Sequence, residues 1–223
     1  MAMSTQTKTR LLKKYEADDG VFVRVEGDPP LDLYSPFGPL IAKTRFPDAL
    51  VARLNAHADT VIAPDRSMEF VLPESVVFTG EPSVASAVAA FIRRYVATVE
   101  HTPLDKLPDA VDFESFWVVS QYAGTPSPVH FHSSDISGVL YLKVPEVDGR
   151  EDARTYISGR RAGCINFIIG GKQRFARSLI SFRPQVGDFY VFPGWLLHGA
   201  EPFSGGGERR SMAFNANIAT DAR

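Results

Sequence analysis

The chain has 223 residues and a mass of 24.5 kDa, with 24 basic and 26 acidic residues and one cysteine. This balanced charge gives no electrostatic footprint for nucleic acid or an anionic membrane, so neither is expected as a partner. Cys164 cannot form an internal disulfide, and no apolar stretch follows the basic start of the chain. No window approaches the ~18 apolar residues that span a bilayer, and we therefore predict a cytoplasmic protein.

The first half of the chain predicts short strands followed by two helices. Residues 21–27 and 38–46 are β-like runs, separated by turns that contain Pro and Gly. Residues 47–63 place Leu50, Leu54 and Val61 at helical spacing, with Pro47 suited to the start of a helix. A second helix is predicted over residues 82–101, where apolar residues form one face.

After Pro108 the sequence becomes β-like. Short runs rich in β-branched and aromatic residues are separated by Gly and Pro, which is typical of a β-sandwich or barrel. The runs cover residues 113–123, 137–145, 163–171, 178–184, 187–194, 196–203 and 208–218. The charged stretch 146–163 is interpreted as a surface loop. Because no linker is visible, we predict a single domain over 1–223, with strands and flanking helices in 1–112 and a β-rich core in 113–218.

Two histidines stand close together in the stretch "SPVHFHSSDISGVLYL", residues 127–142. A single histidine is more often a buried residue satisfied by one backbone carbonyl. On a strand, however, residues i and i+2 point to the same face, roughly 7 Å apart. His130 and His132 would therefore aim two imidazoles at one point, as a metal site requires. A chain of this length needs no structural metal for stability, so a metal here is expected to be functional.

Two further features lie toward the C-terminus. His198 belongs to the run "FPGWLLHGAEPF", and "ERRSMAFNANI" follows it. If the second run is a strand, Arg209 and Ser211 share one face, while Arg210 lies on the other. A guanidinium beside a hydroxyl can bind a carboxylate, because Arg donates two parallel N–H bonds and Ser donates a third. A solvated pair of arginines at the start of a strand is the alternative.

The order His-x-His, His, Arg-x-Ser resembles the 2-oxoglutarate/Fe(II)-dependent oxygenases, whose usual pattern is His-x-Asp/Glu, His, Arg-x-Ser. The resemblance is closest to small oxygenases of marine bacteria and phages that carry His-x-His before a Ser-Gly-Val-x-Tyr-Leu strand. It rests on "QYAG … VHFH … SGVLYL", "FRPQVGDFYVFPGWLLHGAEPF" and "RRSMAFN", and covers about residues 113–218. It implies a mainly β fold, a double-stranded β-helix (jelly roll, cupin-like) with N-terminal flanking α-helices.

The resemblance also implies roles for individual residues. Fe(II) would be bound by His130, His132 and His198. The cosubstrate 2-oxoglutarate would be bound by Arg209 and Ser211, with Tyr141 donating to the same carboxylate and Tyr122 lining its pocket. Phe131 and Trp195 would either shield the pocket or belong to the core.

His132 is a departure, because the family places a carboxylate at this position. Three neutral imidazoles can occupy the same face of the metal, which then keeps its full charge of +2. Asp135 is the alternative ligand if the loop folds back, and a site without a ligand at this position is the third reading. We favour His132.

The implied activity is oxidative decarboxylation of 2-oxoglutarate to succinate, coupled to C–H oxidation of a small-molecule or peptide substrate by O₂. The alternatives are a cupin-like three-histidine metalloprotein whose chemistry does not use 2-oxoglutarate, and an inactive metal-binding module on the same fold. The substrate would be contacted by loops, near residues 103–112 and 146–163. A homodimer is left open.

Overall fold

The computed structural model describes residues 23–34, 38–125, 127–146, 162–170 and 178–218. Their strands form two antiparallel sheets, an eight-stranded sheet in the order β1-β2-β3-β9-β6-β11-β5-β4 and a three-stranded sheet in the order β10-β7-β8. The strands are β1 (Val23–Val25), β2 (Leu31–Tyr34), β3 (Ile41–Arg45), β4 (Met68–Val71), β5 (Val111–Gln121), β6 (Ile136–Lys143), β7 (Ile165–Ile168), β8 (Leu179–Phe182), β9 (Asp188–Pro193), β10 (Leu197–Ala200) and β11 (Arg209–Ile218).

Both predicted helices are present. α1 (Asp48–Val61) begins directly after Pro47, which fixes the backbone angle at the entrance to the helix. α3 (Val84–Val99) begins after Ser83, whose hydroxyl accepts the backbone N–H of Ser86 at 3.0 Å and caps the first turn. Two shorter elements, α2 (Glu74–Val77) and the 3-10 turn η1 (Leu104–Lys106), were not predicted.

Each β-like run after Pro108 forms a strand, and the two N-terminal runs contribute β1 and β3. The sequence did not predict β2 and β4, which have four residues each and are too short for a clear alternation. β3 pairs with β9, so the N-terminal strands extend the same sheet as the core strands. The N-terminal part and the β-rich core therefore share one large sheet.

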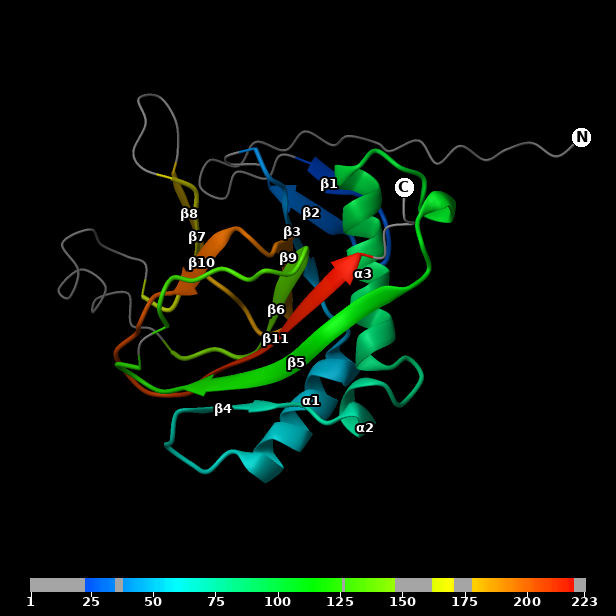
Figure 1. Ribbon diagram of the computed structural model, residues 1–223. Helices are drawn as coiled ribbons and strands as arrows, with labels where there is room; N and C mark the ends of the chain where they lie inside the picture. The colour runs from blue at the N-terminus through cyan, green and yellow to red at the C-terminus, as the bar shows by residue number, and fades with distance from the viewer. Residues whose placement is uncertain (1–22, 35–37, 126, 147–161, 171–177, 219–223) are drawn as a thin grey trace, which may run out of the picture.

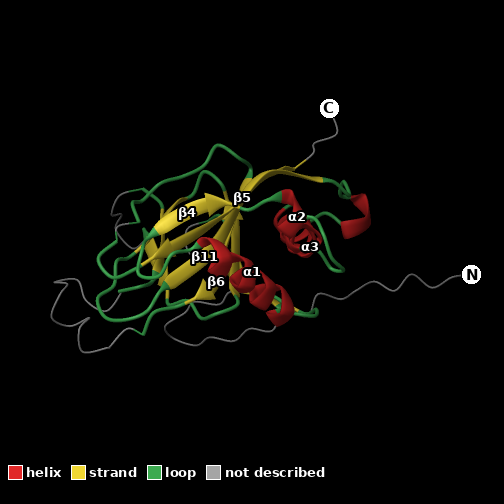
Figure 2. Cartoon of the chain, turned by 90° about the horizontal axis from the view of Figure 1, so that it is seen from below, coloured by secondary structure: helices red, strands yellow, loops and turns green. Residues whose placement is uncertain are grey.

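The large sheet separates two layers (Figure 1). One face packs against α1 and α3 in a hydrophobic cluster that includes Leu54, Ile92, Phe189 and Met212. The other face packs toward the small sheet through a second cluster, rich in aromatic residues, that includes Phe167 and Tyr190 of facing strands. Figure 2 shows the helices on one side of the large sheet. Asn55 of α1 donates a hydrogen bond to the carbonyl of Leu142 in β6 and accepts one from Arg210 of β11. This is the predicted jelly-roll fold with flanking helices.

Two loops were predicted to contact the substrate. Most of the stretch 146–163 lies outside the described residues. Residues 103–112 contain η1 and the beginning of β5, and none of them lines the cavity described below. Among the described residues, no helix is long and apolar enough to cross a membrane.

Candidate metal centre and anion receptor

The three predicted metal ligands lie together at one end of the cavity. His130 and His198 form an isolated antiparallel bridge, in which each backbone N–H donates to the other residue's carbonyl at 2.9 Å. His132 is held two residues further on by a bond from its backbone N–H to the carbonyl of Gly194, also 2.9 Å. The segment is thus extended and lies against β10, so the expected i, i+2 alternation holds although no regular strand forms.

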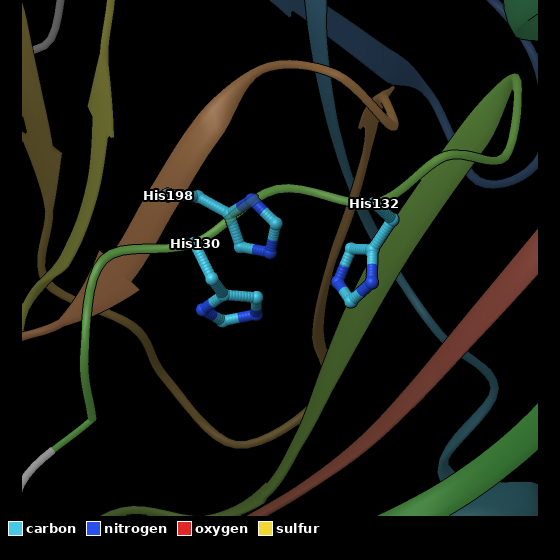
Figure 3. Close-up of side chains that lie close together, drawn as sticks. All are labelled: His130, His132 and His198. Carbon is cyan, nitrogen blue, oxygen red and sulfur yellow. The ribbon is translucent and has the colours of Figure 1, made fainter.

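The imidazoles face one another (Figure 3). One ligand nitrogen from each ring lies within 4.8 Å of the other two, and the ring centroids are 4.4 to 5.3 Å apart. The Nδ1 atoms of His130 and His198 lie 2.8 Å from the carbonyl oxygens of Pro128 and Leu196. An Nδ1–H that donates to a carbonyl leaves Nε2 as a lone-pair ligand, so the rings have the tautomer that a metal needs.

The protonation equilibria also favour metal binding. Burial lowers the pKa of His198 to about 4, despite the hydrogen bond to Leu196, which acts in the opposite direction. Burial, together with the charge of His130, lowers the pKa of His132 as well. Both rings are therefore neutral at neutral pH, and a metal ion does not have to displace a proton from them.

Asp135, the alternative third ligand, is directed elsewhere. Its carboxylate accepts the backbone N–H of Ile218 at 3.0 Å, and its own N–H donates to the side chain of Asn217. Within the described residues, the cluster able to hold a metal comprises His130, His132 and His198 and does not include this carboxylate.

The same cavity, about 250 Å³ in volume, is also lined by Arg209, Ser211 and Tyr141. Arg209 is only 2% exposed. It donates three hydrogen bonds, two to Oε1 of Gln121 and one to the carbonyl of Glu201, and among the described residues no carboxylate forms a salt bridge with it. Because a guanidinium carries five N–H groups, one on each Nη remains available.

Tyr141 and Ser211 are paired neighbours on β6 and β11. Burial raises the pKa of Tyr141, although the charge of Arg209 acts against this, so its phenol is a protonated donor. No hydrogen bond joins either hydroxyl to another residue in the described part of the chain. A buried cation that forms no salt bridge within the described residues, beside two hydroxyls that are free there, forms a receptor for an anionic group.

Arg210 points to the opposite face of β11, as strand alternation predicts. It is bound to Glu208 at 2.6 Å and to Asp59 of α1 at 2.7 Å, and it does not line the cavity. Its role is to attach the strand to the helix layer.

Three aromatic residues lie where the sequence did not predict them. Tyr122 follows the last residue of β5, its N–H donates to Ser67, and it does not line the cavity. Phe131 and Trp195 also lie outside the cavity lining, and their exposed fractions of 63% and 54% exclude a place in the core. Phe131 points outward because it alternates with the two histidines.

Several lining residues were missed. Trp117 contacts His132 edge to face with centroids 5.9 Å apart, Gln121 holds Arg209, and Glu69 of β4 brings a carboxylate to the cavity wall. All three lie in strands beside β11 or one strand beyond it, so only the strand order could have identified them.

Comparison with known proteins agrees with this geometry. Residues 115–215 match a family model described as "Putative 2OG-Fe(II) oxygenase". Over these residues the chain is similar to the 2OG-Fe(II) oxygenases. The matched residues extend from β5 to β11 and include all three histidines and the anion receptor. The search of curated proteins found no match.

Solved structures of this oxygenase class share the fold. A viral collagen prolyl hydroxylase from Paramecium Bursaria Chlorella virus-1, in complex with 2OG, is 15% identical over 81% of this chain and 96% of its own, with a TM-score of 0.51. A prolyl-4-hydroxylase from Pseudomonas putida is 16% identical over 81% and 93%, with a TM-score of 0.52. The epimerase SnoN from nogalamycin biosynthesis, which is alpha-ketoglutarate dependent, is 13% identical over 81% and 79%, with a TM-score of 0.51.

Proposed function

We propose that the protein is a non-haem oxygenase that uses Fe(II), 2-oxoglutarate and O₂ to oxidise a C–H bond of a small-molecule or peptide substrate. His130, His132 and His198 would bind the metal. Arg209, Ser211 and Tyr141 would bind the far carboxylate of 2-oxoglutarate. In this reaction 2-oxoglutarate and O₂ give succinate and CO₂, and the substrate gains one oxygen atom.

One observation carries the proposal: a single cavity holds both the three convergent imidazoles and a buried guanidinium that forms no salt bridge with a carboxylate of the described residues. A dianion with one end at the metal and the other at Arg209 would place negative charge against each of the two cations. Burial strengthens this attraction, because electrostatic interactions are stronger at low dielectric. The sheet fixes the anion receptor through strand pairing, so little reorganisation is needed on binding.

The iron would supply the oxidative chemistry, and the protein would supply position and exclusion of water. Three neutral ligands leave the metal with its full positive charge, which favours binding of dianionic 2-oxoglutarate. The prime substrate would reach the metal past Trp117 and Glu69, which line the cavity. Neighbours of the same fold are named as hydroxylases and as an epimerase, so the fold does not determine what happens to this substrate.

The decisive experiment measures succinate from 2-oxoglutarate in purified protein supplied with Fe(II) and O₂. We expect slow turnover without any added substrate, and none when Fe(II) or O₂ is withheld. His198→Ala, which removes the most buried ligand, is the negative control. Equal succinate from the wild type and from His198→Ala would contradict the proposal.

The two alternatives are separated by an anaerobic titration. Fe(II) protein that binds 2-oxoglutarate as a chelate is expected to develop a weak visible charge-transfer band. A cupin-like protein of different chemistry, or an inactive metal-binding module that does not bind 2-oxoglutarate, would bind the metal without developing this band. Arg209 opposes both alternatives, because neither needs a buried cation in the cavity.

A further inference from the structure

The three histidines are oriented in two different ways. His130 and His198 each direct Nδ1 to the backbone carbonyl two residues earlier, so their own segments set their ring planes. His132 has no such contact among the described residues. Its Nδ1 lies 3.2 Å from Nδ2 of Asn215, a side chain on a different part of the chain.

Asn215 is itself held in place. It pairs with Ser137 of β6 in the large sheet, and the hydroxyl of Ser137 lies 2.7 Å from its Oδ1. Ser137 is 2% exposed, so solvent cannot readily compete for this bond. β11 pairs regularly with β5 up to Asn215, and the register shifts directly after it. A rigid sheet thus presents the Asn215 amide to the outer side of the His132 ring.

We propose that Asn215 is the positioning residue for His132, and that its carboxamide oxygen accepts the Nδ1–H of the metal-bound ring. This rests on the metal-binding part of the proposed function, but not on turnover. Sequence reasoning missed the residue because Asn215 lies 83 positions from His132 and only the fold brings them together.

The hydrogen-bond geometry allows two arrangements of the same atoms. In one, Ser137 donates to Oδ1 and the amide NH₂ donates to Nδ1, which leaves the proton on Nε2. In the other, the amide is rotated by half a turn, so Nδ1–H donates to Oδ1 and the NH₂ donates to the oxygen of Ser137. Only the second leaves Nε2 free for a metal, and O and N of an amide are assigned from such networks. Metal binding would therefore select the second arrangement.

The contact with Asn215 orients His132 and neither of the other two histidines. Without an acceptor at Nδ1, the His132 ring could rotate and present either nitrogen. Mutation of a residue that hydrogen-bonds a metal-ligating histidine typically lowers the metal affinity 10–100-fold. Asn215 would thus give a ligand on an exposed loop the order that the other two histidines obtain from their own backbone.

The test is a titration of the metal-free full chain with Co(II), in which the visible ligand-field bands of the bound metal measure binding. Asn215→Leu keeps the approximate volume and removes both hydrogen bonds, and we expect it to weaken Co(II) binding 10–100-fold and to shift the bands. Asn217→Leu is the matched control: Asn217 lies on the same strand but contacts Glu114 and Asp135 instead of the histidines. We expect that control to bind Co(II) within about threefold of wild type, well below the effect of Asn215→Leu.

Asn215→Asp provides the rescue, because a carboxylate still accepts Nδ1–H, and it should bind Co(II) nearly as well as wild type. In a His132→Ala background, Asn215→Leu should have no further effect, which a double-mutant cycle measures. Wild-type affinity in Asn215→Leu, or an equal loss in Asn217→Leu, would overturn the inference. So would an additive effect in the His132→Ala background.

A measurement on the wild-type protein does not depend on whether any variant folds correctly. In Zn(II)-loaded wild type, the His132 Nδ1–H should give a proton signal that exchanges slowly with water, because Asn215 accepts it. Fast exchange there would also contradict the inference. None of these readouts needs 2-oxoglutarate or O₂, so absence of succinate formation would contradict the proposed oxygenase activity and leave this result standing.

Discussion

Arg209 is the residue whose loss should affect cosubstrate binding most. Removing one partner of a buried, charge-assisted pair costs roughly 2–5 kcal/mol, so Arg209→Met should raise the dissociation constant for 2-oxoglutarate at least tenfold. Anaerobic titration of the Fe(II) protein measures this. Arg66→Met, at an exposed position before β4, is the control and should bind normally. Unchanged affinity in Arg209→Met would mean that the anion binds elsewhere in the cavity.

Gln121 offers a second change at the same receptor. Its amide oxygen accepts from both Nε and Nη2 of Arg209, at 3.0 and 2.8 Å. Gln121→Glu would place a carboxylate there and form an internal ion pair, so 2-oxoglutarate would meet a neutralised receptor. We expect weaker 2-oxoglutarate binding and unchanged Co(II) binding, both measured by titration. A gain in 2-oxoglutarate affinity would contradict this picture of the receptor.

The identity of the third ligand is tested by comparing His132 with Asp135. His132→Ala should abolish tight Fe(II) binding, whereas Asp135→Ala should preserve most of it, because the Asp135 carboxylate is bound to the Ile218 N–H. His132→Asp should retain iron, since a short carboxylate can occupy the same coordination position. Equilibrium dialysis of Fe(II) under anaerobic conditions gives the ranking, and the reverse order would assign the site to Asp135.

At the scale of elements, β11 carries different chemistry on its two faces. Arg209 and Ser211 line the cavity and Asn215 contacts His132, while Arg210 and Met212 face the helices. Burial acts to raise the pKa of Glu208, but hydrogen bonds from Arg210, Ser120 and Lys143 outweigh it and hold that pKa below its ordinary value of 4.5. Glu208 therefore stabilises the native state only while it is ionised.

The lowered pKa of Glu208 determines how the free energy of unfolding depends on pH. Because the native pKa is lowered, the unfolded chain binds a proton first as the pH falls, and the contribution of Glu208 is lost below about pH 4.5. Glu208→Gln should lower the free energy of unfolding at neutral pH and flatten its decline in acid. Urea unfolding between about pH 3 and 7 measures this. Glu26→Gln, at an exposed position, should leave the profile as in wild type.

The alternation of side chains along a strand explains which site residues could be predicted from the sequence. Alternation correctly placed Arg209 and Ser211 on one face of the strand and Arg210 on the other, because a period of two is a local property of any strand. Tyr122 did not reach the cavity because β5 ends one residue earlier, and strand ends are not encoded by alternation. Asn215 and Gln121 were missed because their roles depend on which strands become neighbours, and β5, β6 and β11 meet only in the folded sheet.

At the scale of the whole molecule, the metal would connect the small sheet with the large sheet. His198 belongs to the small sheet, His130 bridges to it, and His132 contacts Asn215 of the large sheet. We propose that residues 23–218 unfold as a single unit, since β3 and β9 join the N-terminal strands to this core. Thermal unfolding should then show one transition.

Metal binding should raise the temperature of that transition. A ligand at 100 times its dissociation constant adds about 2.7 kcal/mol, which corresponds to roughly 5–10 °C for a chain of this size. Calorimetry with and without Co(II) measures the shift. His198→Ala should remove it and Arg209→Met should retain it, so a shift that survives in His198→Ala would indicate metal binding at another place.

The two adjacent arginines make β11 sensitive to length as well as to substitution. Deleting one residue between Arg209 and Asn215 would reverse the faces of the positions on one side of the deletion, so a receptor group would turn toward the helices or an anchoring group toward the cavity. The exposed segment Gly205–Gly207, just before the strand, can absorb a change of length, because its backbone accepts conformations that other residues avoid. Insertions and deletions among related chains should therefore collect at these glycines and spare the ten residues that follow Glu208.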